Sequence, residues 1–420
     1  MTGERSDGVA ALRRWVADTL GGEVTSWRRL AEGNSRSLWF AGTGSDEAVL
    51  RVDAEDGPLS GTELTLHREA AVYRALGGTG VLAPRLLAVD VERQAMLLTR
   101  VPGSAAWTDQ VLDGLLRELG RLHSVDARRL DLPGFDRCAR GDLDLWARIA
   151  AARIDPPSPL VDLAFTVLRE HFPGEPERLV LCHGDAGPGN VMHENGTVTA
   201  LLDWEFAHFG DPVDDLAWVT ARAVLYGLDL PGFAERVREH YEPAAGLTVE
   251  DGRLAYWQAV ALLRNLVSCH AAVANPVRGR DRLVHLMLIP ALERLVIDAL
   301  ARLEGVELAP TPTPEGPADL PGGDVLREVA AGFDTILRAL TDAEARSRAK
   351  RMRILLGQLA RTWTLAPGIA RADAAAEPAC DRAGRLQQLA DAAERRLALF
   401  PRSAVMARAE LASMPREAVR

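Results

Sequence analysis

Lysine is almost absent from this chain of 420 residues, since Lys350 is the single lysine and arginine supplies the other basic side chains. Acidic residues outnumber basic ones, and the formal net charge is −10. Because nucleic acids and anionic membranes attract basic surfaces, this balance disfavours both as general partners. We therefore expect no nucleic-acid partner and no membrane partner, while a local basic pocket remains open.

Cysteines are few, and their spacing matches no metal-binding or disulfide pattern. Cys138, Cys182, Cys269 and Cys380 stand far apart, without a Cys-x-x-Cys pair. No apolar run approaches the ~20 residues of a membrane span. The N-terminal residues are charged and amphipathic, unlike the apolar core of a signal peptide. Together these absences predict a cytoplasmic protein in a reducing environment.

The first hundred residues show the pattern of an antiparallel sheet with one helix after its third strand. Three short runs of partly alternating character lie between residues 24 and 53, separated by the turn-forming segments EGN and GTGSD. The helix that follows is expected to end at Gly77-Gly78, and residues 83–103 are predicted to form two more strands. From residue 108 onward, leucines at helical spacing predict a mainly helical region.

Two changes in composition divide the rest of the chain. Residues 306–323 are rich in Pro and Gly and are predicted to form a linker. Residues 324–420 are rich in Ala, Arg and Leu and predict three or four helices without catalytic groups, a unit suited to self-association or to protein binding. We expect four units: 1–100, 101–305, the linker 306–323 and a helical accessory domain over 324–420.

The segment LCHGDAGPGNVMHENGTVTALLDWE concentrates the polar groups that a catalytic site requires. Asn195-Gly196 suits the tight turn of a β-hairpin, because both residue types tolerate a positive φ. If this pair centres the turn, Asn190 lies opposite Leu201, and Asp203 lies on the same face, roughly 7–8 Å from Asn190 at the backbone. Two oxygen-bearing side chains at that separation can share one cation, and oxygen ligands suit Mg²⁺.

Asp185 precedes Asn190 with the spacing Asp-x-x-x-x-Asn, which is also that of the protein-kinase catalytic loop. In phosphoryl transfer, one carboxylate orients the attacking hydroxyl and accepts its proton, while an Asn and an Asp hold Mg²⁺ against the nucleotide phosphates. Asp185, Asn190 and Asp203 match this set of groups.

A transition-metal site is the competing interpretation of the same segment. It is less favoured, because the sequence has no helical His pair at metal spacing and because His193 and Asp203 are expected on different faces. Its candidate ligands are His183, Asp185, His193, Asp203 and His208.

The residues HGDAGPGN and LLDWE resemble the signature of the aminoglycoside phosphotransferase and choline kinase superfamily, and the resemblance extends over residues 20–300. It implies an α+β, protein-kinase-like fold with two lobes, an antiparallel-sheet N-terminal lobe that binds nucleotide and a mainly helical C-terminal lobe. It also implies an ATP- and Mg²⁺-dependent kinase acting on a small-molecule hydroxyl, with Asp185 as catalytic base and Asn190 and Asp203 as Mg²⁺ ligands. The C-terminal helices resemble an all-α domain that accompanies phosphotransferases linked to acyl-CoA dehydrogenases, which implies a hydroxy-acyl acceptor.

Glu69 interrupts an otherwise apolar helical stripe of Leu66, Tyr73 and Leu76, so its carboxylate needs a partner. In kinase-like folds, that partner is a lysine on the third strand, which also contacts the nucleotide phosphates. Here Arg51 stands at the expected strand position. We predict an Arg51–Glu69 pair beside the nucleotide, although arginine does not replace lysine neutrally. The alternative is an outward-facing Arg51 with Glu69 at the helix edge.

The loop expected to cover the phosphates, LAEGNSRSLW, lacks the Gly-x-Gly-x-x-Gly pattern of protein kinases. Gly33, Asn34 and Ser35 are its candidate phosphate contacts. Because so little of the pattern is present, the choice between ATP and GTP stays open.

The acceptor is expected to bind between the motif and the later helices. An aminoglycoside pocket would need many acidic groups, and a choline site would need an aromatic cage, but the sequence shows no clear concentration of either. Arg264 favours instead an anionic or carboxylate-bearing acceptor. The candidate contacts are Trp218, Trp257, Arg264, Asn265 and His270.

Two other functions remain open. A catalytically degenerate kinase-like fold could bind nucleotide or acyl compounds, which the missing lysine and the thin glycine loop favour. A scaffold that acts through the C-terminal helices is compatible with either activity. A pure binding protein has no use for a base, so Asp185, Asn190 and Asp203 favour the kinase.

Overall fold

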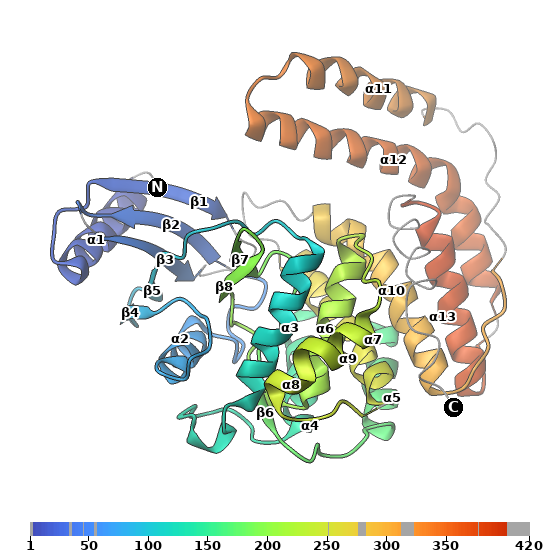
Figure 1. Ribbon diagram of the computed structural model, residues 1–420. Helices are drawn as coiled ribbons and strands as arrows, with labels where there is room; N and C mark the ends of the chain where they lie inside the picture. The colour runs from blue at the N-terminus through green and yellow to red at the C-terminus, as the bar shows by residue number, and fades with distance from the viewer. Residues whose placement is uncertain are drawn as a thin grey trace.

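The computed structural model describes residues 3–32, 36–44, 46–53, 57–250, 252–275, 283–311, 323–376 and 378–400. In this part of the chain, an antiparallel sheet with two helices forms an N-terminal lobe, and a mainly helical C-terminal lobe lies beside it (Figure 1). None of the described helices is long and apolar enough to cross a membrane. The architecture is the α+β, two-lobed fold expected from the sequence. The candidate phosphate contacts Gly33, Asn34 and Ser35 lie outside the described residues.

Five antiparallel strands form the N-terminal sheet, in the order β1-β2-β3-β5-β4. Their bounds are Ser26–Glu32 (β1), Arg36–Gly42 (β2), Glu47–Asp53 (β3), Leu86–Asp90 (β4) and Ala95–Thr99 (β5). Side chains alternate between the two faces of a strand. On β5, Ala95 and Leu97 therefore join the core beside helix α1 (Gly3–Leu20), while Met96 and Leu98 join the core beside helix α2 (Leu66–Leu76).

Helix α2 follows the third strand in the chain, as the sequence predicts. The hydroxyl of Thr65 accepts a hydrogen bond from the amide of Arg68 (3.2 Å) and caps the first turn. The helix ends at Leu76, directly before Gly77 and Gly78, so its predicted end is confirmed.

The longer helices of the C-terminal lobe surround one buried core, which includes Trp146, Trp218 and Trp257. These helices are α4 (Ala139–Arg153), α5 (Pro159–Glu170), α6 (Pro212–Leu225), α9 (Arg253–Ala274) and α10 (Leu283–Leu303). Helix α3 (Asp109–Ser124) contributes instead to a second core, which it shares with α2. Short helical turns join α6 to α9, namely α7 (Phe233–Arg236), η2 (Val237–Tyr241) and α8 (Glu242–Ala245). Two small antiparallel ladders complete the lobe, β6 (Val180–Cys182) with β9 (His208–Gly210) and β7 (Val191–Glu194) with β8 (Thr197–Leu201).

The β7–β8 hairpin turns at Asn195 and Gly196, as predicted, with φ angles of 50° and 83°. Its register differs from the predicted one by a single residue. Val191, not Asn190, pairs with Leu201, because an irregularity in the ladder shifts the pairing. The expected placement of Asn190 opposite Leu201 is therefore wrong.

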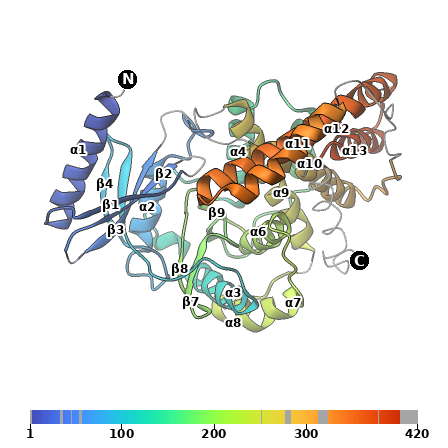
Figure 2. The same ribbon diagram turned by 90° about the horizontal axis from the view of Figure 1, so that it is seen from above.

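Three helices follow the expected linker: α11 (Gly323–Ala339), α12 (Ala343–Ala375) and α13 (Arg382–Leu397). Helices α11 and α12 form an antiparallel hairpin that projects from the molecule, whereas α13 packs along α10 (Figures 1 and 2). Leu386, Ala390 and Ala393 of α13 lie in the same buried core as α9 and α10. The C-terminal helices are thus divided between a projecting hairpin and a helix that belongs to the C-terminal lobe.

Candidate active site

Asp185 lies on the loop between β6 and β7, and its carboxylate is held on both oxygens. Asn190 donates from Nδ2 to Asp185 Oδ2 (2.6 Å) and to the Asp185 carbonyl (2.9 Å). Trp218 of helix α6 donates from Nε1 to Asp185 Oδ1 (2.7 Å). The amide nitrogen of Asn190 therefore faces Asp185, which leaves the amide oxygen for another partner.

Arg222, which sequence reasoning missed, forms an ion pair with the same oxygen of Asp185. It also donates to the carbonyl of Pro188 (2.8 Å), and so ties the carboxylate to its own loop. Burial opposes its charge, but the Asp185 carboxylate holds the pKa of Arg222 above its ordinary value. Gly187 leaves room for this side chain, since a Cβ there would lie 3.1 Å from Cβ of Arg222. The available signal was helical spacing, because Trp218 and Arg222 are four residues apart on one face.

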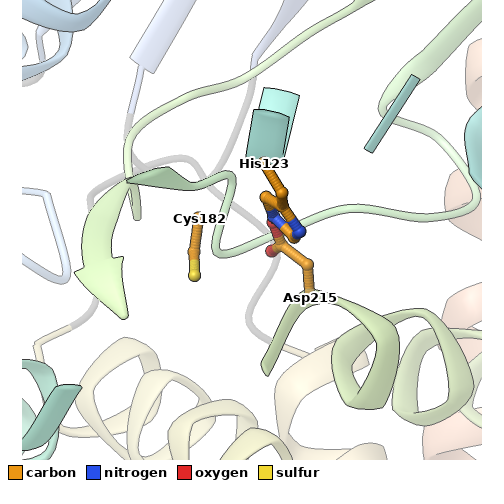
Figure 3. A group of neighbouring side chains, drawn as sticks. All are labelled: His123, Cys182 and Asp215. Carbon is orange, nitrogen blue, oxygen red and sulfur yellow. The ribbon is translucent and has the colours of Figure 1, made fainter. Parts of the chain in front are cut away.

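A buried acid anchors the start of the same loop. Asp215 accepts hydrogen bonds from the backbone amides of His183 (2.7 Å) and Gly184 (2.8 Å) and contacts His123 Nε2 (3.0 Å; Figure 3). Burial acts to raise the pKa of Asp215, but these contacts lower it to about 2, so the group stays charged. Asp211 caps helix α6, and Asp215 fixes the loop.

Cys182 lies beside His123 and Asp215 in Figure 3, and a Cys–His–Asp group suggests a metal. A metal-binding cysteine must be a thiolate. Here burial raises the pKa of the Cys182 thiol well above its ordinary value, and Sγ donates to the Asp211 carbonyl (3.4 Å). Since both carboxylate oxygens of Asp215 also accept backbone amides, the described contacts of this group hold the loop in place.

The histidines of the competing transition-metal interpretation contact separate partners. His183 Nε2 lies 2.9 Å from the Leu202 carbonyl, His193 Nε2 lies 2.7 Å from the Ala106 carbonyl, and His208 Nε2 lies 2.9 Å from a carboxylate of α6. Each imidazole is thus engaged by a different part of the protein, and the set does not favour a shared metal ion.

Arg51 pairs with two carboxylates from different parts of the chain. Its Nη1 lies 2.9 Å from Glu69 Oε1, so the predicted Arg51–Glu69 pair is confirmed. Its Nη2 lies 2.6 Å from Asp203 Oδ1, a contact that sequence reasoning did not anticipate. Glu69 Oε1 also accepts a hydrogen bond from the amide of Trp204 (3.2 Å). Burial opposes the charge of Arg51, but Asp203 and Glu69 hold its pKa well above the ordinary value.

Asp203 lies two residues beyond the end of β8 and so is not part of the strand on which the sequence placed it. The amide of Leu202 donates to the Asn190 carbonyl (2.8 Å), so the chain still brings Asp203 next to the loop that carries Asn190. Asp203 has φ 65°, a left-handed conformation that is uncommon for a residue with a side chain and that recurs at functional sites. Its side chain is 33% exposed, so solvent and ligands can reach the carboxylate.

The acceptor candidates mostly contact groups other than Asp185. Arg264 is 1% exposed and pairs with Asp214 and, at 3.4 Å, with Asp142, so its predicted contact with an anionic acceptor is wrong. Two buried carboxylates already satisfy its charge. Trp257 is buried in the core, and Asn265 donates to the Ala261 carbonyl (2.9 Å). His270 Nε2 lies 4.0 Å from a carboxylate oxygen of Glu293. Of the five candidates, Trp218 is the one that donates a hydrogen bond to Asp185.

The model of the phosphotransferase enzyme family matches residues 26–263, more than half of the chain. The chain is 30% identical over 218 residues to acyl-CoA dehydrogenase family member 11 of Gallus gallus, covering 46% of this chain and 28% of that protein. It is 29% identical over 259 residues to an aminoglycoside 3'-phosphotransferase of Streptomyces fradiae, covering 55% of this chain and 92% of that protein. The chain thus spans about a quarter of the length of the acyl-CoA dehydrogenase relatives that it matches.

Solved structures of low sequence identity share the fold. The choline kinase of Streptococcus pneumoniae has a TM-score of 0.54 at 16% identity, covering 70% of this chain and 98% of that one. A choline/ethanolamine kinase family protein of Mesorhizobium loti has a TM-score of 0.50 at 18% identity, covering 71% and 94%. These likenesses show the fold, and the family match over more than half of the chain shows that the chain belongs to the phosphotransferase enzyme family.

Proposed function

We propose that this protein moves the γ-phosphoryl group of ATP, bound with Mg²⁺, to a hydroxyl of a small molecule. The observation that carries the proposal is the grouping of Asp185 and Asn190 on one loop, hydrogen-bonded to each other, with Asp203 following the strand beside them. These are the groups that phosphoryl transfer uses as base and as metal ligands.

In the proposed reaction, Asp185 orients the acceptor hydroxyl and takes its proton as the acceptor oxygen bonds to the γ-phosphorus. The bond from that phosphorus to the bridging oxygen breaks, and ADP leaves with the oxygen. Asn190, Trp218 and Arg222 hold the Asp185 carboxylate on both oxygens. Its orientation is therefore set before the acceptor binds, which lowers the entropic cost of reaction.

The donor groups of Asn190 and Asp203 fit a Mg²⁺ ion. The Asn190 amide nitrogen is engaged by Asp185, which leaves an oxygen ligand, and the partly exposed Asp203 carboxylate supplies a second. When bound, Mg²⁺ would neutralise charge on the nucleotide phosphates. Arg51, which now pairs with Asp203, would share this carboxylate with the ion.

Arg51 and Glu69 are proposed to serve the nucleotide phosphates. The buried Glu69 carboxylate fixes the guanidinium, and a guanidinium can grip two phosphate oxygens at once. Gly33, Asn34 and Ser35 are proposed to cover the phosphates from the β1–β2 loop. ATP is the proposed nucleotide, with GTP as the competitor to be compared.

The acceptor is proposed to be a hydroxy-acyl compound. Its first support is the similarity to acyl-CoA dehydrogenase family members, in which the matched region is a minor part of the protein. Its second support is charge, since Arg222 contacts the proposed base and donates to the hydroxyl of Tyr226 (3.2 Å), whose side chain is exposed. A guanidinium beside the base disfavours polycations such as aminoglycosides and favours an anionic acceptor.

A catalytically degenerate, nucleotide- or acyl-binding protein is the second candidate. Two observations favour it, because arginines occupy both functional carboxylates: Arg222 pairs with Asp185, and Arg51 pairs with Asp203. In a kinase, Asp185 must still reach the acceptor and Asp203 must still reach the metal despite these ion pairs. A protein that only binds its ligand has no such requirement.

Calorimetry tests the proposal against this alternative. We would titrate ATP and GTP into the wild type, Asp203→Asn and the control Asp131→Asn, with and without Mg²⁺, where Asp131 is an exposed carboxylate. The proposal expects nucleotide binding that needs Mg²⁺ and Asp203 and that the control retains. Product formation from hydroxy-acyl, choline-like and aminoglycoside acceptors then separates a kinase from a binding protein. Binding that is indifferent to Mg²⁺ and to Asp203 would overturn the metal assignment.

A further inference from the structure

The projecting hairpin of α11 and α12 exposes two rows of large apolar side chains. On α11 the row is Val325, Val329 and Ile336, and on α12 it is Met352, Leu355, Leu359 and Trp363. These seven side chains, the hairpin face, are between 39% and 55% exposed. Spacings of three, four and seven residues place each row on a single side of its helix.

Both rows lie on the same side of the hairpin. The opposite side carries a groove lined by Ala330, Ala331 and Asp334 of α11 and by Arg353, Ile354, Gly357, Gln358 and Arg361 of α12. At ~100° per residue, each apolar row lies roughly opposite the groove-lining residues of its own helix. The hairpin therefore carries its large exposed apolar side chains on one side and, on the other, the groove in which Arg353 pairs with Asp334 at 2.6 Å.

The contact between the two helices leaves most of this apolar surface outside. The described residues of the hairpin that are buried are Ala349, Gln358, Ala360 and Ile369, all on helix α12. A pair of antiparallel helices with large apolar side chains on one outer face has the form of half of a four-helix bundle. We propose that a second copy of this chain covers the hairpin face, so that two hairpins form a four-helix bundle between two kinase molecules.

The size of the hairpin face agrees with this assignment. Seven half-exposed apolar side chains present on the order of 600 Å², at the upper end of the patches found on monomers. Two such faces pressed together bury on the order of 1,200 Å², the lower end of stable protein interfaces. A two-fold axis makes the same face serve both copies, as in most homodimers.

Charge selects the arrangement within the bundle. Helix α12 carries six basic residues in its first twenty positions, while α11 carries three acidic and two basic residues. Stacking α12 on the partner's α12 would bring two strongly basic helices together, whereas stacking α12 on the partner's α11 separates them. The two-fold axis therefore runs along the helices, and each helix lies antiparallel to both of its neighbours.

An anionic membrane is a less suitable occupant of the same face. Apolar side chains beside arginines are typical of helices that lie on membranes. The whole chain, however, carries a net charge of −10, which opposes its approach to an anionic surface.

The test is the molar mass of the full-length protein by light scattering and sedimentation over a dilution series. We expect a dimer that dissociates on dilution, and a monomer at every concentration would overturn the proposal. Val329→Glu and Leu359→Glu, on different helices, should each raise the dimer dissociation constant about tenfold or more. The matched control is Val91→Glu, because Val91 is an exposed valine in the β4–β5 turn, away from the hairpin face. Circular dichroism and melting temperature verify that each variant folds.

Two further measurements exclude other occupants and other arrangements. Sedimentation with vesicles containing phosphatidylglycerol should not capture the protein, and Leu359-dependent capture of a monomer would overturn the proposal. Val329→Cys and Leu359→Cys, each made with Cys380→Ser to remove an exposed thiol, should form an intermolecular disulfide when mixed and not separately. A disulfide in Val329→Cys alone would place α11 against α11 and contradict the arrangement.

Discussion

Arg222 of helix α6 pairs with Asp185, the carboxylate that we propose as the base, and also donates to Pro188 of the same loop. A fixed positive charge on a base can act in two opposite ways. It can hold the carboxylate toward the acceptor, or it can occupy the position that the acceptor needs. The proposed kinase requires the first action and a degenerate fold permits the second, so the behaviour of Arg222 variants separates the two functions.

Replacing Arg222 with alanine should lower turnover about 100-fold, because a loosened base loses its alignment with the acceptor. The affinity for Mg²⁺-ATP should change little, since Arg222 contacts the base rather than the proposed metal ligands. Arg222→Lys should recover only part of the rate, because lysine is a point charge without a planar fork. Guanidinium added to Arg222→Ala should restore activity in a saturable manner. The control is Arg238→Ala, at an exposed arginine, and faster turnover in Arg222→Ala would mean that Arg222 blocks the base.

Replacing Asp185 with asparagine should reduce turnover by roughly 10²–10⁴-fold while preserving Mg²⁺-ATP binding. The amide keeps the shape of the side chain and can still accept from Trp218, but it cannot take the acceptor's proton. Single-turnover product formation and calorimetry measure the two effects separately. Full activity in this variant, beside an unaffected Asp131→Asn control, would remove Asp185 from the role of base.

Replacing Arg51 with alanine should destabilise the protein by about 3–5 kcal/mol, because it leaves the buried Glu69 carboxylate without its cation. The matched control is Arg100→Ala, which removes an exposed ion pair with Glu47 and should cost about 0–1 kcal/mol. Urea unfolding of both variants gives the two free energies of unfolding. Equal losses would mean that the Arg51–Glu69 pair contributes no more than a surface contact.

The contribution of Asp215 to stability should depend on pH in a known direction. Its pKa is lowered from 3.8 to about 2 in the folded protein, so the folded state favours the charged form. Its contribution, on the order of 2 kcal/mol, is present above pH ~4 and is lost as the pH falls towards about 2. The difference in free energy of unfolding between wild type and Asp215→Asn should therefore shrink over this interval. A difference that widened on acidification would show that the pKa is shifted the other way.

The Arg51–Glu69 pair could be predicted because its evidence is local. A carboxylate within an apolar helical stripe demands a cation, and the strand pattern offers one arginine at the right position. The same logic located the hairpin turn at Asn195-Gly196. Both predictions depend on spacing over a few residues, where the period of a helix or a strand is reliable.

The errors arose where distant segments or local irregularities decide the outcome. The predicted pairing of Asn190 with Leu201 was wrong by one residue, because the alternation of side chains in a strand does not reveal an irregularity in the hydrogen-bonded ladder. Arg264 was predicted to contact an anionic acceptor because its actual partners, Asp142 and Asp214, lie far from it in sequence and could not be recognised there. Arg222 was missed for the same reason, since its partner Asp185 lies in the preceding loop region and only the fold brings the two together.

Helix α13 has a consequence for how the enzyme is made. Leu386, Ala390 and Ala393 fill the core that α9 and α10 share, although more than a hundred residues separate α13 from α9. During synthesis, the helices that surround the motif leave the ribosome long before the segment that closes their core. The core of this lobe is therefore incomplete until α13 has emerged, and a chain that stopped before α13 would leave that core open to water, even with Asp185, Asn190 and Asp203 all present.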